Sequence, residues 1–198
     1  MLPAVALAIV MLFSFAAALA WRWSHTATDS ADPTHSRRVP GAHEVAWRYI
    51  VIHHSATEGG SAAEFARVQQ RDRHWDELGY HFVIGNGKGC PDGKVEVGSR
   101  WPAQKWGAHC GGTPNNEYNN VGIGICLVGD FRRRMPTPQQ LESLRQLTTF
   151  LARRYQIPPG RILGHGQAPG AATECPGDKL QEYVCTTLRD EIANDQPE

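Results

Sequence analysis

The sequence has no excess of charge of either sign. Among its 198 residues, 20 are Lys or Arg and 20 are Asp or Glu, so the formal net charge is zero. Binding to the phosphate backbone of a nucleic acid requires a surplus of basic side chains. The charge balance therefore gives no basis for a nucleic-acid partner, and we expect none.

Cysteine is also scarce. Five cysteines in this length are too few for a dense disulfide scaffold, and the odd number leaves at least one thiol outside any intramolecular pair. Hydrophobic residues make up 41% of the chain, which excludes a disordered protein and suffices for a core. The length allows one ordinary domain with a tail.

The N-terminal segment has a composition of its own. Residues 2–21 contain no charged side chain, and about 20 apolar residues suffice to cross a bilayer, which predicts a membrane anchor. The small residues at 16–20 offer cleavage sites for a secretory signal peptide, although the usual basic region before the apolar run is missing. We assign residues 1–23 to a signal peptide or membrane anchor and leave both interpretations open.

A polar segment follows. Residues 24–46 are rich in Ser, Thr, Asp, Pro, Gly and His, which predicts a flexible linker. Arg22, Arg37 and Arg38 follow the apolar run, a bias that alone favours a cytoplasmic C-terminal side, but acidic residues share the stretch. The folded domain is predicted over residues 47–198.

Strand and helix patterns alternate through this domain. The aromatic and β-branched run 47–52 predicts a strand that leads straight into His53. A capping box at Ser61 and Glu64, followed by apolar residues at helical spacing, predicts a helix over 61–78. Further strands are predicted at 80–84, 95–97, 121–128 and 162–163, and further helices from Thr137 to before Pro158 and over 179–193. This mixture predicts an α/β or α+β domain.

Three residues near the ends of these elements are candidate metal ligands. His53 and His165 each follow a predicted strand, and Cys175 lies ten residues after His165. Two imidazoles and one thiolate form a reasonable shell for Zn²⁺, and three protein ligands leave a fourth position for water, as in catalytic sites. A cysteine hydrolase, with Cys175 as nucleophile and His165 as base, is a competing hypothesis in which chelators would have no effect.

Five short motifs occur in a fixed order along the domain. They are VIHHSAT at 51–57, LGYHFVI at 78–84, NVGIGI at 120–125, GH at 164–165 and TECPG at 173–177. Together they resemble the zinc N-acetylmuramoyl-L-alanine amidases, which share a fold with phage lysozyme-type amidases and peptidoglycan recognition proteins. The resemblance covers roughly residues 47–185. It implies a central mixed β-sheet flanked by helices, with zinc in a surface groove.

The resemblance also implies roles for individual residues. The family's ligands fall on His53, His165 and Cys175, because its first motif has the form H-x-Ser/Thr. Strand alternation turns His54 to the opposite face, where we expect a buried, hydrogen-bonded side chain. The family's tyrosine falls on Tyr80, and its Lys or Thr two residues before the cysteine ligand falls on Thr173.

These roles imply a reaction. Zinc lowers the pKa of a bound water from about 15.7 toward about 7, and the amide between N-acetylmuramic acid and L-alanine would be hydrolysed with Tyr80 and Thr173 assisting. Some relatives place a glutamate where this chain has Cys126, and a thiol is a poor substitute for that general base. The substrate would be peptidoglycan or muropeptides.

Weaker candidates lie in the loop before the strand predicted at 121–128. His109 could touch substrate near the metal or be a surface histidine, and Trp106 could stack on a sugar ring or simply pack. Asn119 could bind glycan or be a turn residue, and we favour the turn.

The pairing of the cysteines stays open. With Cys175 as a ligand, three pairings of the other four cysteines can form in an exported protein. We state a disulfide between Cys90 and Cys110 as a hypothesis. Cys126 could then be a free thiol near the metal, and Cys185 is the remaining cysteine.

The main alternative is a binding module. Some peptidoglycan recognition proteins bind wall fragments without cutting them, and those typically lack the cysteine ligand that Cys175 would supply here. An intracellular amidase acting on recycled fragments would lack the N-terminal apolar segment, so we expect an extracytoplasmic protein that is periplasmic, membrane-anchored or secreted. The sequence leaves the oligomeric state open.

Overall fold

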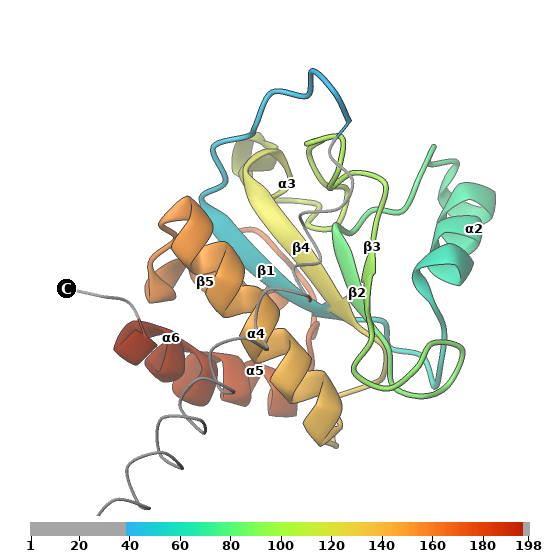
Figure 1. Ribbon diagram of the computed structural model, residues 1–198. Helices are drawn as coiled ribbons and strands as arrows, with labels where there is room; N and C mark the ends of the chain where they lie inside the picture. The colour runs from blue at the N-terminus through green and yellow to red at the C-terminus, as the bar shows by residue number, and fades with distance from the viewer. Residues whose placement is uncertain (1–38, 196–198) are drawn as a thin grey trace, which may run out of the picture. The chain divides into compact units, whose positions relative to one another are not determined.

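A computed structural model describes residues 39–195 of the chain (Figure 1). The predicted signal peptide or anchor at 1–23 and most of the predicted linker lie outside this part. Residues 39–46 contact the domain, since the backbone N–H of Val39 donates to the carbonyl of Pro102 and that of Val45 donates to Gln104 Oε1. Within residues 39–195, no helix combines the length and apolar character that a membrane crossing requires.

Five strands form one mixed sheet. They are β1 (Tyr49–His54), β2 (Phe82–Ile84), β3 (Val95–Val97), β4 (Gly122–Leu127) and β5 (Ile162–Gly164). The order is β3-β2-β4-β1-β5, and every neighbouring pair is parallel except β2 with β3. The central mixed sheet flanked by helices that the sequence predicted is confirmed.

The two faces of the sheet differ in composition. Side chains alternate along a strand, so Ile50 and Ile52 of β1 face the main core while Val51 and His53 face the other side. The core side is mainly apolar and is fully buried at Ile52. The opposite side carries the polar His53 and is where a site can open.

Two helical segments cover the core side (Figure 1). The first is α4 (Pro138–Tyr155), which begins with the predicted capping box between Thr137 and Gln140 and ends at Gln156 in the left-handed conformation. The second runs through α5 (Asp178–Tyr183), the π-helical η4 (Val184–Leu188) and α6 (Arg189–Asp195). Leu144, Leu151 and Leu188 pack there against the strands.

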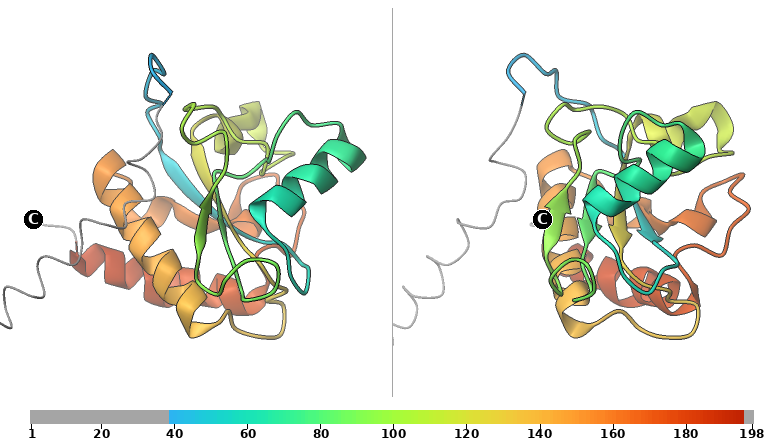
Figure 2. Two further views of the ribbon diagram at one scale, coloured as in Figure 1. Left: turned by 45° about the vertical axis from the view of Figure 1, so that its right-hand side comes forward. Right: turned by 90° about the vertical axis from the view of Figure 1, so that its right-hand side faces the viewer.

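The helix α2 (Ala62–Arg73) lies on the other side, and Figure 2 shows it away from α4. The predicted helix over 61–78 is therefore too long. Ser61 caps its start as expected, but His74 adopts φ 54° and its backbone N–H donates to the carbonyl of Gln69, which ends the helix. The Gln69 side chain then accepts from the backbone N–H of Gly79 and fixes the chain that follows.

The connection from β3 to β4 is largely irregular, as predicted, but it contains two short helical segments. These are η1 (Pro114–Asn116) and α3 (Glu117–Asn120). The remaining turns are η2 (Pro159–Arg161) and η3 (His165–Gln167), which flank β5. The element η3 brings His165 directly to the end of a core strand.

All five cysteines are free thiols. The hypothesised disulfide between Cys90 and Cys110 is wrong. Cys90 lies in the connection between β2 and β3, whereas Cys110 packs with Val51 and Leu163 of β1 and β5. The strand β4 separates these two parts of the sheet, so the two cysteines lie in different parts of the domain.

Candidate active site

The predicted ligands meet at one edge of the sheet. His53 is the penultimate residue of β1, and His165 directly follows β5, the parallel neighbour of β1. The carboxyl ends of parallel strands are where open sheets hold ligands, because the loops there diverge and leave a crevice. Cys175 reaches the same place from the loop that leads into α5.

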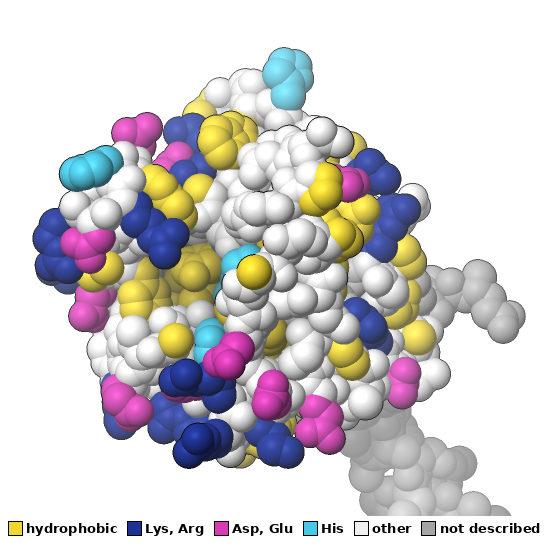
Figure 3. Space-filling model, turned by 180° about the vertical axis from the view of Figure 1, so that it is seen from behind, with side chains coloured by type: hydrophobic (Ala, Val, Ile, Leu, Met, Phe, Trp, Pro, Cys, Tyr) yellow, Lys and Arg dark blue, Asp and Glu magenta, His cyan; other side chains and the backbone are white. Residues whose placement is uncertain are grey.

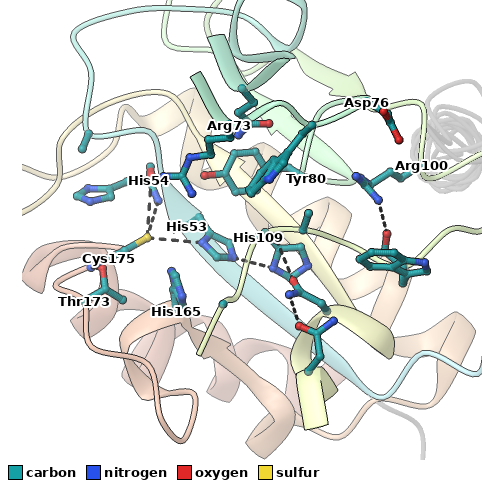
Figure 4. Close-up of a pocket in the computed structure, with 18 of the residues that line it drawn as sticks. His53, His54, Arg73, Asp76, Tyr80, Arg100, His109, His165, Thr173 and Cys175 are labelled. Carbon is teal, nitrogen blue, oxygen red and sulfur yellow. Dashed lines mark hydrogen bonds between the residues drawn. The ribbon is translucent and has the colours of Figure 1, made fainter. Parts of the chain in front are cut away.

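The donor atoms are close enough to share one ion (Figure 4). One ligand atom from each of His53, His165 and Cys175 lies within 4.8 Å of the others, and this is the one such group in the described chain. His53 Nδ1 is 3.6 Å from Cys175 Sγ. A tetrahedral zinc ion with bonds of about 2.0 Å to nitrogen and about 2.3 Å to sulfur places such atoms about 3.5 Å apart. The donor set of two imidazoles and one thiol fits Zn²⁺, and the distance from His53 to Cys175 already matches a tetrahedral site.

Burial sets the protonation of this group. It lowers the pKa of His53 well below its usual value, with further lowering from the neighbouring His109 and His165, and it also lowers the pKa of His165. Burial raises the pKa of Cys175 to about 12. Both imidazoles are thus ready to ligate, whereas the thiol needs a cation to lose its proton. A cysteine nucleophile without metal is disfavoured by the same pKa.

His54 lies apart from the group. Its side chain is buried, and its Nδ1 accepts from the backbone N–H of Phe131 at 3.2 Å, with Asp130 Oδ1 at 3.9 Å. The expected buried, hydrogen-bonded His54 is therefore what the structure shows. The backbone N–H of His54 donates to Cys175 Sγ at 3.4 Å, so this residue still supports the ligand sulfur.

Tyr80 lies beside the ligands. Its ring centroid is 5.2 Å from that of His53. Burial raises the pKa of Tyr80 well above its usual value, and the Cys126 and Cys175 thiols raise it further. The phenol consequently stays protonated and is available as a hydrogen-bond donor. Cys126, one of the two thiols that raise this pKa, pairs with His53 in the register of β4 against β1.

Thr173 is exposed on the side of the cavity opposite Tyr80, and it precedes the candidate ligand Cys175 by two residues. Its hydroxyl accepts a hydrogen bond from the backbone N–H of Cys175 at 3.2 Å. Because the acceptor role uses a lone pair, the hydroxyl proton of Thr173 is left for a group in the pocket. The structure thus places Thr173 and Tyr80 on two sides of the candidate metal position (Figure 4).

These residues line a cavity of about 630 Å³. Figure 3 shows it as a hollow with histidine at its floor, on the face away from the viewer of Figure 1. Trp106 stands at the rim with 55% of its surface exposed, and the Arg100 guanidinium lies 5.6 Å from the centre of its ring. Asp76 is the one carboxylate of the described lining, and it lies far from Cys175 (Figure 4).

His109 is more deeply placed than the sequence suggested. It lines the cavity but is only 8% exposed, and both ring nitrogens contact protein atoms. Its Nδ1 lies 3.1 Å from His53 Nε2 and its Nε2 lies 3.2 Å from the carbonyl oxygen of Gly122. The alternative of a surface histidine is therefore wrong, and a direct contact with substrate stays a prediction.

Two further residues of the cavity have roles that the sequence did not reveal. Asn119 is buried and binds the backbone around His109, accepting from the N–H groups of His109 and Cys110 at 2.8 Å each. Arg73, the last residue of α2, points into the cavity beside Tyr80 (Figure 4). An arginine at a helix C-terminus is common for electrostatic reasons alone, so its residue type carries no signal of a site.

Comparison with known proteins identifies the family. A family model described as N-acetylmuramoyl-L-alanine amidase matches residues 43–178. The chain belongs to this amidase family. The resemblance inferred from the five motifs is thereby confirmed.

Amidase-family relatives include both named amidases and named recognition proteins. The chain is 32% identical over 142 residues to peptidoglycan-recognition protein LB of Drosophila melanogaster, covering 67% of this chain and 55% of the relative. It is 30% identical over 153 residues to N-acetylmuramoyl-L-alanine amidase of Sus scrofa, covering 71% of this chain and 23% of the relative. The chain thus spans about half of the first relative and about a quarter of the second.

A solved amidase structure has the same fold. It is N-acetylmuramoyl-L-alanine amidase LysC from Clostridium intestinale, which matches with a TM-score of 0.59 at 27% identity. The match covers 76% of this chain and 85% of that chain. The chain therefore shares both family and fold with a protein named as an amidase.

Proposed function

We propose that this chain is a zinc-dependent N-acetylmuramoyl-L-alanine amidase. The observation that carries the proposal is the group of His53, His165 and Cys175, whose donor atoms lie within 4.8 Å of one another at the floor of an open cavity. Zinc held there supplies a Lewis acid that polarises a carbonyl and acidifies a water molecule. Peptidoglycan or muropeptides are the proposed substrates, consistent with the family.

The reaction adds water across one amide bond. The bond between the lactyl carbonyl of N-acetylmuramic acid and the nitrogen of L-alanine breaks, oxygen of water joins the carbonyl carbon, and a proton joins the departing nitrogen. Tyr80 and Thr173 each present a hydroxyl from opposite walls. Hydroxyl donors aimed at the oxygen that gains charge stabilise the transition state.

Among the described residues that line the cavity, no carboxylate lies beside the candidate ligands to take part in the proton transfers, since Asp76 is far from Cys175 (Figure 4). Cys126 occupies the strand position where some relatives have glutamate, and burial raises the pKa of this thiol well above its usual value. A thiol held protonated in this way is no general base. We therefore propose that the proton released by the attacking water passes to the departing nitrogen, while Tyr80 and Thr173 assist by donating hydrogen bonds to the carbonyl oxygen.

We further propose that the protein acts outside the cytoplasm. The uncharged segment 2–21 supports export, either as a signal peptide or as an anchor, with a linker up to residue 46 and the amidase domain over 47–198. Peptidoglycan lies on that side of the membrane. The location and the substrate therefore support each other.

The alternative is a recognition module, which the name of the Drosophila relative raises. Digestion of purified peptidoglycan by the full chain, followed by mass spectrometry, distinguishes the two. The proposal predicts free stem peptides that begin with L-alanine and glycan strands that keep their length. Binding of peptidoglycan by a folded, zinc-loaded protein without release of peptides would contradict it.

A further inference from the structure

Two hydrogen bonds link a candidate ligand to the backbone of β4. His53 Nε2 lies 3.1 Å from His109 Nδ1, and His109 Nε2 lies 3.2 Å from the carbonyl oxygen of Gly122. All three groups are buried. The nitrogen of His53 that takes part, Nε2, is the one that faces away from Cys175 (Figure 4).

The donor and the acceptor in each of these two hydrogen bonds follow from the carbonyl oxygen of Gly122. A carbonyl oxygen only accepts, so the proton of this contact sits on His109 Nε2. The other nitrogen of a neutral imidazole is an acceptor, so His109 Nδ1 accepts and His53 Nε2 donates. His53 Nδ1 is then left with a lone pair, and this is the atom 3.6 Å from Cys175 Sγ.

The fold builds a slot for the His109 ring. A Cβ atom at Gly107 would clash with His109 Cδ2, and one at Gly124 would clash with the same atom. Any side chain at either position would displace the imidazole. The backbone N–H of His109 donates a 2.8 Å hydrogen bond to Asn119 Oδ1, which fixes the backbone at this position. The ring therefore has one position in which both nitrogens find partners.

We propose that His109 is a positioning residue that fixes the tautomer of His53, so that the Nδ1 lone pair faces the metal position. The inference rests on the proposed function, because it assigns His53 as a ligand. Without the acceptor at His109 Nδ1, His53 is free to carry its proton on Nδ1 and present an N–H group to the ion. Partners that orient a ligating histidine typically change metal affinity by about 10- to 100-fold.

The first test is made on the unmutated full chain without metal. Nitrogen-15 labelling of histidine and NMR distinguish a protonated from an unprotonated ring nitrogen. The inference predicts a proton on Nε2 and none on Nδ1 for His53, with the same arrangement for His109. A proton on His53 Nδ1 would overturn it, and this readout needs neither zinc nor a variant that folds.

The second test compares zinc affinity between variants by competition with a chromogenic chelator. His109→Phe fills the slot without an acceptor and is expected to weaken zinc binding by about 10- to 100-fold. His109→Asn keeps an amide oxygen at the place of Nδ1 and is expected to recover most of the affinity. His74→Asn, at an exposed cavity position, is the matched control and should bind as the wild type does.

The outcomes separate the two proposals. A folded His109→Phe protein that binds zinc within about threefold of wild type would overturn the role of His109 while leaving the metal site intact, since a true orienting partner costs about tenfold or more. A wild-type protein that has the expected tautomers but binds no zinc would instead overturn the proposed function. Thermal unfolding of each variant shows whether a loss of affinity reflects a loss of fold.

Discussion

The imidazole of His53 and the phenol of Tyr80 lie side by side, with ring centroids 5.2 Å apart and ring planes at 55°. One belongs to the candidate metal group, and the other carries a hydroxyl that stays protonated because burial raises its pKa. A hydrogen-bond donor next to a Lewis acid is the arrangement that an amide carbonyl needs as its oxygen gains charge.

Tyr80→Phe should therefore slow the reaction without weakening the metal site. Removal of one donor to the developing oxyanion typically lowers kcat by about 10²- to 10³-fold. Zinc affinity should stay unchanged, because the phenol is no ligand. Tyr118→Phe is the matched control, since Tyr118 packs against Tyr49 at 4.6 Å outside the cavity lining. Equal kcat in both variants would remove Tyr80 from the mechanism.

Gly124→Ala should destabilise the domain and weaken zinc binding together. The added Cβ would clash with His109 Cδ2, in a strand paired on both sides. Overpacking of a buried site typically costs about 1–3 kcal/mol, which urea unfolding resolves. Gly160→Ala, where a Cβ meets nothing within 4 Å, should be neutral. A Gly124→Ala protein as stable as wild type would show that the His109 slot is not tight.

Glu77 should make the domain more stable above its unfolded-state pKa than below it. Burial acts to raise the pKa of Glu77, but hydrogen bonds from Ser99 and Lys105 and the charge of Arg100 outweigh it and lower the pKa. A carboxylate with a lowered pKa stabilises the fold above its unfolded value of about 4.3, and this contribution disappears as pH falls through the folded value.

The measurement is the free energy of unfolding of wild type and Glu77→Gln at several pH values. The difference between the two proteins should be largest near neutral pH and should shrink between about pH 5 and pH 3. A difference that stays constant over that interval would show that Glu77 is not held ionised by Ser99, Lys105 and Arg100.

Trp106→Ala should raise KM and leave kcat largely intact. The exposed indole at the rim offers a face for a sugar ring, and loss of a contacting tryptophan commonly costs more than about 1 kcal/mol of binding. That corresponds to a KM raised by about fivefold or more. Met135→Ala, exposed outside the cavity lining, is the control. An unchanged KM would assign Trp106 to packing against Arg100 alone.

Much of the site follows from local sequence patterns. His53 and His165 each end a strand pattern, and the resemblance to the amidase family marks both as candidate ligands. The structure adds that β1 and β5 are parallel neighbours, which brings the two histidines to one edge. The strand at 95–97 and the capped start of α4 at Pro138 also occur where their patterns predict them. These features are predictable because the residues that specify a short strand or a helix cap lie within a few positions of one another.

Other features depend on contacts between distant segments. Trp75 and Leu78 continue the helical spacing of α2, yet the helix ends at His74, where the backbone adopts the left-handed conformation. The Gln69 side chain then accepts a hydrogen bond from the backbone N–H of Gly79 and holds the following segment outside the helix. The burial of His109 requires glycine on two separate segments. No local pattern specifies that Gly107 and Gly124 meet around one imidazole.

The central claim is that zinc held by His53, His165 and Cys175 drives hydrolysis of the amide. The most direct measurement is the release of new N-terminal alanine from purified peptidoglycan by the full chain, with chelator and then with added zinc. We predict release that stops with chelator and returns with zinc, is lost in Cys175→Ala and survives in Cys185→Ala. Release that chelator leaves unchanged, or none from a folded, zinc-loaded protein that still binds peptidoglycan, would contradict the claim.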